Sequence, residues 1–140
     1  ILGNRHPSIC PYEVFQTADR PLVLAVGNDD QFRRLCEVLD VPELAQDDRF
    51  ATNPARVAAR EELGPRLGAA LSQRNASEWF ERLSAAGGPA GPINDLAAAV
   101  DLADRLGLDP IVEVDSVPTV ANPIRLSATP VQYRSGPPQR

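Results

Sequence analysis

Residues able to do chemistry are few in this sequence. His6 is the one histidine, and Cys10 and Cys36 are the two cysteines. A cysteine and a histidine form a catalytic dyad only when they are neighbours in space. His6 and Cys10 are four residues apart in a proline-containing segment that disfavours the helix needed to join them. Two cysteines and one histidine also cannot supply the four ligands of a structural zinc site. We therefore expect no metal site and two buried thiols, with a single disulfide left open.

Two other segments carry polar or glycine-rich patterns. Asn28-Asp29-Asp30 places two carboxylates directly after an apolar run. Such residues cap helices, and the same helix start makes the segment a candidate ligand contact. The glycine-rich segment 87–91 falls where a helix must end, which favours a structural turn. The sequence contains neither a common phosphate-binding loop nor a Gly-x-Ser-x-Gly nucleophile motif. No catalytic residue is predicted from these residues.

The elements that position these segments follow from periodicity. Residues 12–17 alternate in polarity, and residues 22–26 form a continuous apolar run after a short turn. This pattern predicts an antiparallel hairpin. Apolar residues at helical spacing predict a helix over 29–39, and 42–45 is typical of a single helical turn.

The rest of the chain has the patterns of further helices and strands. A helix starts at Thr52-Asn53-Pro54, and we expect a kink or a break in it at Gly64-Pro65, because proline is costly in a helix interior. Asn75 and Glu78 form the pattern of a capping box, which opens a helix that ends at Gly87. The remaining expected elements are an extended segment at 90–93, a helix from Asn94 or Asp95 to Leu106, and strands at 111–114, 117–120 and 124–127.

This order of elements favours an α+β fold with helices packed on one side of a small antiparallel sheet. We expect residues 1–11 to form a linker or lid arm. Residues 12–127 are expected to form the small α+β domain, and residues 128–140 a C-terminal linker or tail.

Composition narrows the class of protein. The 140 residues carry a net charge of −5, which disfavours nucleic acid and anionic membranes as partners. The apolar runs of the sequence are too short to span a bilayer. Since methionine is absent, we expect the chain to be a piece of a longer protein. All 14 basic residues are arginine, which resembles the codon usage of a high-G+C bacterial genome.

The sequence strongly resembles the family III CoA-transferases, which include formyl-CoA and carnitine-CoA transferases and α-methylacyl-CoA racemases. The resemblance covers nearly the whole chain in the order and spacing of the family. It is carried by Gly3-Asn4-Arg5-His6-Pro7, Pro11-Tyr12-Glu13-Val14-Phe15, Thr17-Ala18-Asp19, Leu22 to Asn28, Gln31 to Cys36, Asp48 to Asn53, Arg56-Val57, Pro89 to Asp95 and Asn122 to Ser127.

The resemblance implies that this chain is the small domain of a cytoplasmic enzyme about three times longer. Family members move CoA between carboxylic acids through acyl-aspartyl and aspartyl-CoA thioester intermediates. The nucleophilic Asp would lie upstream of these residues, so the isolated chain is expected to be inactive. A CoA thioester would be the substrate, with no tightly bound cofactor. The partners would be a large domain and, in an interlocked homodimer, a second subunit.

The resemblance also suggests where the substrate lies. The segment Gly3-Asn4-Arg5-His6-Pro7 matches the place of a glycine-rich loop that covers the thioester. Gly3, Asn4, Arg5 and His6, together with Asn28 and Asp29, are therefore the candidate residues close to substrate or CoA. Asp29-Asp30-Gln31-Phe32 replaces a Glu-Pro-Gln-Phe run of the racemases, which favours a transferase. A racemase fragment and a non-catalytic interaction module derived from the lid domain remain the alternatives.

Overall fold

The computed structural model describes residues 3–136 and 138. Its internal contacts divide the chain into two compact units, Ile1–Ile93 and Asn94–Arg140, called here the first and the second unit. This division falls inside the range 12–127 that the sequence suggested as one domain. That range, with the arm at 1–11 and the tail at 128–140, stays a prediction. No helix in the described part of the chain is long and apolar enough to cross a membrane.

The first unit is built on a three-stranded antiparallel sheet in the order β1-β2-β3. The strands are β1 (Tyr12–Gln16), β2 (Pro21–Ala25) and β3 (Ala90–Pro92). In the predicted β1-β2 hairpin, Phe15 pairs with Leu22 and Glu13 pairs with Leu24. These four side chains are buried while their neighbours along each strand are more exposed. One face of the sheet therefore faces the core, as alternation requires.

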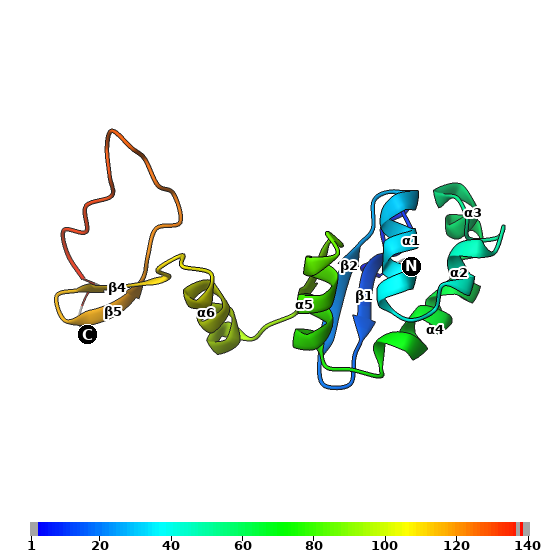
Figure 1. Ribbon diagram of the computed structural model, residues 1–140. Helices are drawn as coiled ribbons and strands as arrows, with labels where there is room; N and C mark the ends of the chain where they lie inside the picture. Colours follow the sequence, from blue (N-terminus) through cyan, green and yellow to red (C-terminus); the bar gives the residue numbers. More distant parts are fainter. Residues whose placement is uncertain (1–2, 137, 139–140) are drawn as a thin grey trace. The chain divides into compact units, whose positions relative to one another are not determined.

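Five helices accompany this sheet (Figure 1). They are α1 (Asp29–Val38), α2 (Glu43–Gln46), α3 (Asn53–Ala58), α4 (Arg60–Leu71) and α5 (Ala76–Ala85). Helix α4 contacts β1, α5 contacts β3, and α1 contacts α5. The core between the helices and the sheet includes Phe32, Leu67 and Trp79. The predicted α+β class is confirmed.

Local chemistry explains where α5 begins and ends. The Asn75 side chain and Glu78 form the predicted capping box. At the other end, the Gly88 amide donates to the Leu83 carbonyl and the Gly87 amide to the Ser84 carbonyl. These two bonds form a Schellman motif, which needs a left-handed residue, and Gly87 supplies it at a φ of 68°. The start of the glycine-rich segment is thus the predicted structural turn, while Ala90 and Gly91 at its end belong to β3.

The break that was one of the two outcomes expected at Gly64-Pro65 is wrong, whereas a kink there stays a prediction. The helical run is broken instead at Ala59, between α3 and α4, and α4 continues through Pro65. Proline leaves the carbonyl four residues earlier, that of Glu61, without its helical donor. Glu61 and Pro65 are both exposed, so water can reach this side of the helix, while Leu67 packs on the opposite, buried side. The apolar face therefore outweighs the proline.

The second unit contains α6 (Leu96–Arg105) and a hairpin of β4 (Ile111–Val114) and β5 (Val117–Val120). Asp95 caps α6 by accepting from the Ala98 amide at 2.8 Å. The predicted strand at 124–127 is wrong, because these residues form no strand. The Asn122 side chain accepts from the Ile124 amide at 2.9 Å, a local bond that competes with strand pairing.

Candidate functional site

The segment 3–11, called here the arm, is fastened to the first unit by the side chain of Asn53 at the start of α3. Its Oδ1 accepts from the Cys10 amide at 3.0 Å, and its Nδ2 donates to the Ser8 carbonyl at 2.8 Å. The arm also joins the sheet, because the His6 amide donates to the Tyr12 carbonyl at 2.9 Å. The backbone of the arm is irregular, but it is held by hydrogen bonds to α3 and to β1.

Arg60, in the first turn of α4, binds the middle of the arm. Its Nη2 donates to the His6 carbonyl at 2.7 Å and to the Ile9 carbonyl at 3.4 Å. The residue is only 6% exposed. Its Nη1 is buried and has no hydrogen-bond partner among the described residues. Burying a guanidinium is costly unless it is hydrogen-bonded, so the two carbonyls also offset part of the cost of burying Arg60.

Arg56 on α3 is fully buried and binds the end of the arm. Nε donates to the Cys10 carbonyl at 2.7 Å and Nη1 to the Phe50 carbonyl at 3.0 Å. Nη2 donates to Oδ1 of Asp29 at 2.8 Å. The guanidinium also lies 4.4 Å from the centre of the Phe32 ring, a cation–π contact. Each of the three guanidinium nitrogens therefore has a hydrogen-bond acceptor.

The arm residues predicted to face substrate have structural partners of their own. Oδ1 of Asn4 accepts from the Val14 amide at 3.1 Å. Arg5 forms ion pairs with the buried Glu13 at 2.8 Å and with Glu61 at 2.7 Å. The hydrogen bond to Glu13, and then the charge of Glu13, raise the pKa of Arg5. Gly3 adopts a φ of 61°, a left-handed conformation that other residues adopt at a cost.

His6 and Tyr12 form an aromatic pair at the base of the arm. Their rings are stacked with centroids 5.2 Å apart and planes inclined by 17°. Nδ1 of His6 accepts from the Ser8 amide at 3.2 Å. Since Nδ1 is occupied as an acceptor, the ring carries its proton at Nε2 in the neutral form.

The predicted residues at the start of α1 lie near the end of the arm. The Val26 amide donates to the Pro11 carbonyl at 3.0 Å, which places the arm beside the strand that leads into α1. Oδ1 of Asn28 caps this helix by accepting from the Gln31 amide at 2.9 Å. Asp29 is joined to the arm through Arg56. Arg56 thus links the start of α1 to the end of the arm, a connection that the sequence did not reveal.

The surroundings of the two cysteines disfavour the reactive thiolate form. Both are free and buried. Burial raises the pKa of each thiol, and that of Cys36 reaches about 12. A thiol in such surroundings is a poor nucleophile, because the thiolate is the reactive form. Among residues 3–136 and 138, no cluster of His, Cys, Asp and Glu could hold a metal ion.

Sequence reasoning missed Glu13, Asn53, Arg56 and Arg60 as residues that shape the site. Two signals were available. Arg56 and Arg60 are four residues apart in an alanine-rich helical run, a spacing that places both on one helix face. Glu13 alternates with Phe15 in a strand, so it falls on the core face, where a carboxylate requires a cationic partner.

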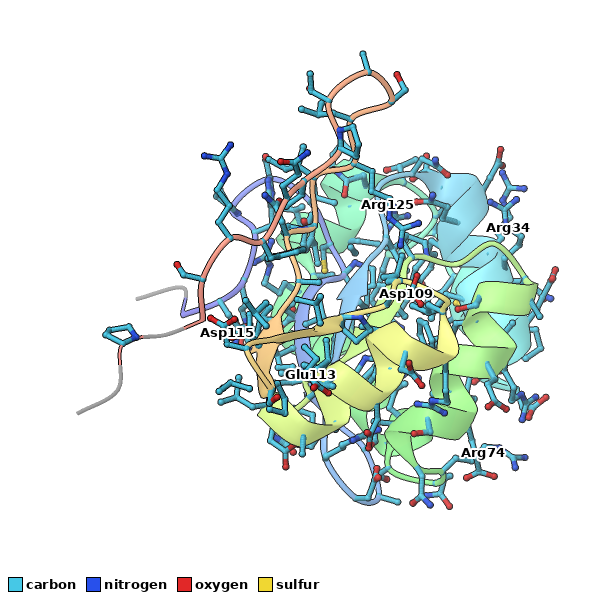
Figure 2. All side chains as sticks on the ribbon, turned by 90° about the vertical axis from the view of Figure 1, so that its left-hand side faces the viewer. Arg34, Arg74, Asp109, Glu113, Asp115 and Arg125 are labelled. Carbon is cyan, nitrogen blue, oxygen red and sulfur yellow. The ribbon has the colours of Figure 1, made fainter. Side chains whose placement is uncertain are left out.

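A separate hollow lies in the second unit. Its volume is about 310 Å³, and its lining is mostly apolar, with Leu108, Pro110 and Val120 beside Asn122 and Arg125. Arg125 pairs with Asp109 at 3.3 Å; both are labelled in Figure 2. None of the residues predicted from the sequence as substrate-proximal lines this hollow.

The chain belongs to CoA-transferase family III, whose family model matches residues 1–140. A succinate–glutarate CoA-transferase of Agrobacterium fabrum is 41% identical over 143 residues, covering 99% of this chain and 36% of that protein. An acetyl-CoA:oxalate CoA-transferase of Acetobacter aceti is 39% identical over 126 residues, covering 90% of this chain and 32% of that protein.

Solved structures agree with this assignment. A CAIB/BAIF family protein from Brucella suis superposes with a TM-score of 0.85 at 36% identity, covering 98% of this chain and 36% of that one. The chain therefore spans about a third of the length of the relatives it matches.

Proposed function

We propose that this chain is part of an enzyme that transfers CoA between carboxylic acids, and that its first unit forms a lid and part of the acyl pocket. The family match along residues 1–140 carries this proposal. The fastened arm supports it, because a lid needs a defined position over the bound thioester.

In the proposed mechanism, an aspartate outside these residues attacks the thioester carbonyl, which expels the CoA thiolate and forms an acyl-aspartyl anhydride. The thiolate then attacks the aspartyl carbonyl of the anhydride, which releases the donor acid and leaves CoA as an aspartyl thioester. Both the thioester and the acyl-aspartyl anhydride are open to attack by water. The contribution of this chain is to exclude water from them, so that the acceptor carboxylate reacts instead. The candidate residues Gly3, Asn4, Arg5, His6, Asn28 and Asp29 would lie closest to substrate.

The proposal extends to substrates and assembly. The relatives are named for acetyl-CoA with oxalate and for succinate with glutarate, so a small carboxylic acid is the proposed acceptor class. A large domain and a second subunit would complete the active enzyme. We place it in the cytoplasm, with CoA bound only as substrate.

The test compares the full-length protein, made from the complete open reading frame, with the 140-residue chain alone. Acetyl-CoA or succinyl-CoA is mixed with oxalate, glutarate or succinate, and the new thioester is measured by mass spectrometry. We expect transfer by the full-length protein and none above buffer by the isolated chain. Turnover by the isolated chain would refute the placement of the nucleophile. Absence of transfer by the full-length protein across a broad panel of acids would refute the proposed reaction.

A further inference from the structure

We propose that Arg56 and Arg60, the arginine pair, are positioning residues that set the arm over the substrate and so decide how much thioester is lost to water. This inference rests on the proposed lid role of the arm. In this inference, two buried residues of α3 and α4 influence thioester hydrolysis through the arm, without touching the reacting atoms themselves.

The arginine pair binds the backbone of the arm and not its side chains. Arg60 donates to the carbonyls of His6 and Ile9, and Arg56 donates to the carbonyl of Cys10. Three carbonyls within one short irregular segment therefore have their donors on two adjacent helices. Because the arm has no strand partner for these groups, its path depends on the arginine side chains.

The guanidinium group suits this task. It is planar and presents its donors in a rigid fork, so two acceptors bound to one group are held at a fixed separation. Burial strengthens the effect, since water cannot compete for the donors of the fully buried Arg56. The arm is thereby fixed to helices whose own positions are set by the core.

Arg56 also connects the two groups of candidate residues. The same guanidinium donates to the Cys10 carbonyl at the end of the arm and to Asp29 at the start of α1. A shift of α3 would therefore move the arm and Asp29 together. The arginine pair thus holds the arm and the start of α1, which the proposed function places around the acyl group, in a fixed arrangement.

The arginine pair should therefore influence how much of the thioester is hydrolysed and how much is used for CoA transfer. Hydrolysis adds water across the thioester and releases one acid and one free CoA thiol, whereas transfer conserves the thioester. A loosened arm admits water and misplaces the acceptor, and misplacement by about 1 Å can cost on the order of a hundredfold in rate. Loss of an arginine contact should therefore raise the ratio of hydrolysis to transfer by about tenfold or more.

The experiment uses Arg60→Gln and Arg60→Lys in the full-length protein, with Arg33→Gln as the matched control. Arg33 pairs with Asp30 on the exposed side of α1, and among the described residues it makes no hydrogen bond or ion pair with the arm. Free CoA thiol and new thioester are measured in the same reaction. We expect a raised ratio in Arg60→Gln, a smaller rise in Arg60→Lys, whose ammonium still reaches one carbonyl, and no change in Arg33→Gln.

Hydrogen–deuterium exchange on the same proteins gives a second readout that does not depend on activity. In Arg60→Gln the amides of His6, Ser8, Ile9 and Cys10 should exchange about tenfold faster or more, while those of β2 and α5 keep their rates. A purely structural role would instead lower the amount of folded enzyme and leave the ratio unchanged.

Two outcomes overturn the inference while leaving the proposed function intact. One is a folded Arg60→Gln enzyme that transfers CoA with an unchanged ratio. The other is unchanged exchange in the arm. If Arg60→Gln does not fold, an unchanged ratio in Arg60→Lys overturns it equally. Failure of the unmodified full-length protein to transfer CoA would refute the proposed function itself.

Discussion

Two neighbouring aspartates in the first turn of α1 offer a controlled test of the Arg56 contact. Asp29 and Asp30 both interact with the positive end of the helix dipole, worth about 0.3–1 kcal/mol each. Asp30 pairs in addition with the exposed Arg33, a surface pair worth about 0.2–1 kcal/mol. Asp29 accepts a hydrogen bond from the buried Arg56 at 2.8 Å.

The expected difference in the free energy of unfolding between Asp29→Ala and Asp30→Ala follows from those contacts. A hydrogen bond to a charged group contributes about 1.5–3 kcal/mol. The Asp29 side chain is 43% exposed, so solvent screening places the value near the lower end, about 1.5 kcal/mol. Asp29→Ala should therefore lower the free energy of unfolding by about 2 kcal/mol, and Asp30→Ala by about 1 kcal/mol.

The assay is urea unfolding followed by the fluorescence of Trp79. This is the only tryptophan, and it is buried in the first unit, so its emission reports on the relevant unit alone. Asp29→Asn serves as a third variant, because it keeps an acceptor without the charge, and we expect an intermediate loss. Equal losses for Asp29→Ala and Asp30→Ala would show that the buried contact contributes nothing, and would refute the reasoning.

Three further outcomes are expected. Asn53→Ala should cost about 2 kcal/mol in urea unfolding, because it leaves the Cys10 amide without an acceptor, whereas Asn53→Asp keeps that acceptor and should cost less than half as much. Burial raises the pKa of Cys36 to about 12 from 9.0, so the free energy of unfolding should fall as the pH rises from about 9 towards 12, and Cys36→Ala should flatten this dependence. The Arg49 hydrogen bond lowers the pKa of Asp47 from 3.8 to about 2, so stability should fall as the pH drops through this window. Acid titrations in which Asp47→Asn behaves like the unchanged chain would contradict the last of these.

Features set by neighbours in the sequence could be predicted. The β1-β2 hairpin is predicted by two apolar runs on either side of a short turn. The start of α5 is predicted by its capping box, and its end by the glycine that follows. The free, buried state of Cys10 and Cys36 agrees with their interpretation as small apolar groups. In each case, residues close in the sequence carry the physical cause.

Features set by distant partners could not be predicted. The cost of Pro65 in a helix is local, but the burial of Leu67 and Leu71 that offsets it depends on the packing of α4 in the core. The segment 124–127 has strand composition but no partner strand. The arm has the composition of a loose loop, since its fastening residues lie more than forty positions away, as with Asn53 and Cys10.

The form of that fastening explains why the arm sequence says so little about the arm structure. Arg56 and Arg60 bind main-chain carbonyls, which every residue type supplies. The arm backbone is therefore held largely from α3 and α4, and arm side chains that make no such contacts can change without altering its path. In the proposed enzyme, such a division would let one lid backbone present different side chains to different acyl groups. In the proposed enzyme, substrate choice would then depend on the side chains of residues 3–8, whereas protection from water would depend on the arginine pair beneath them.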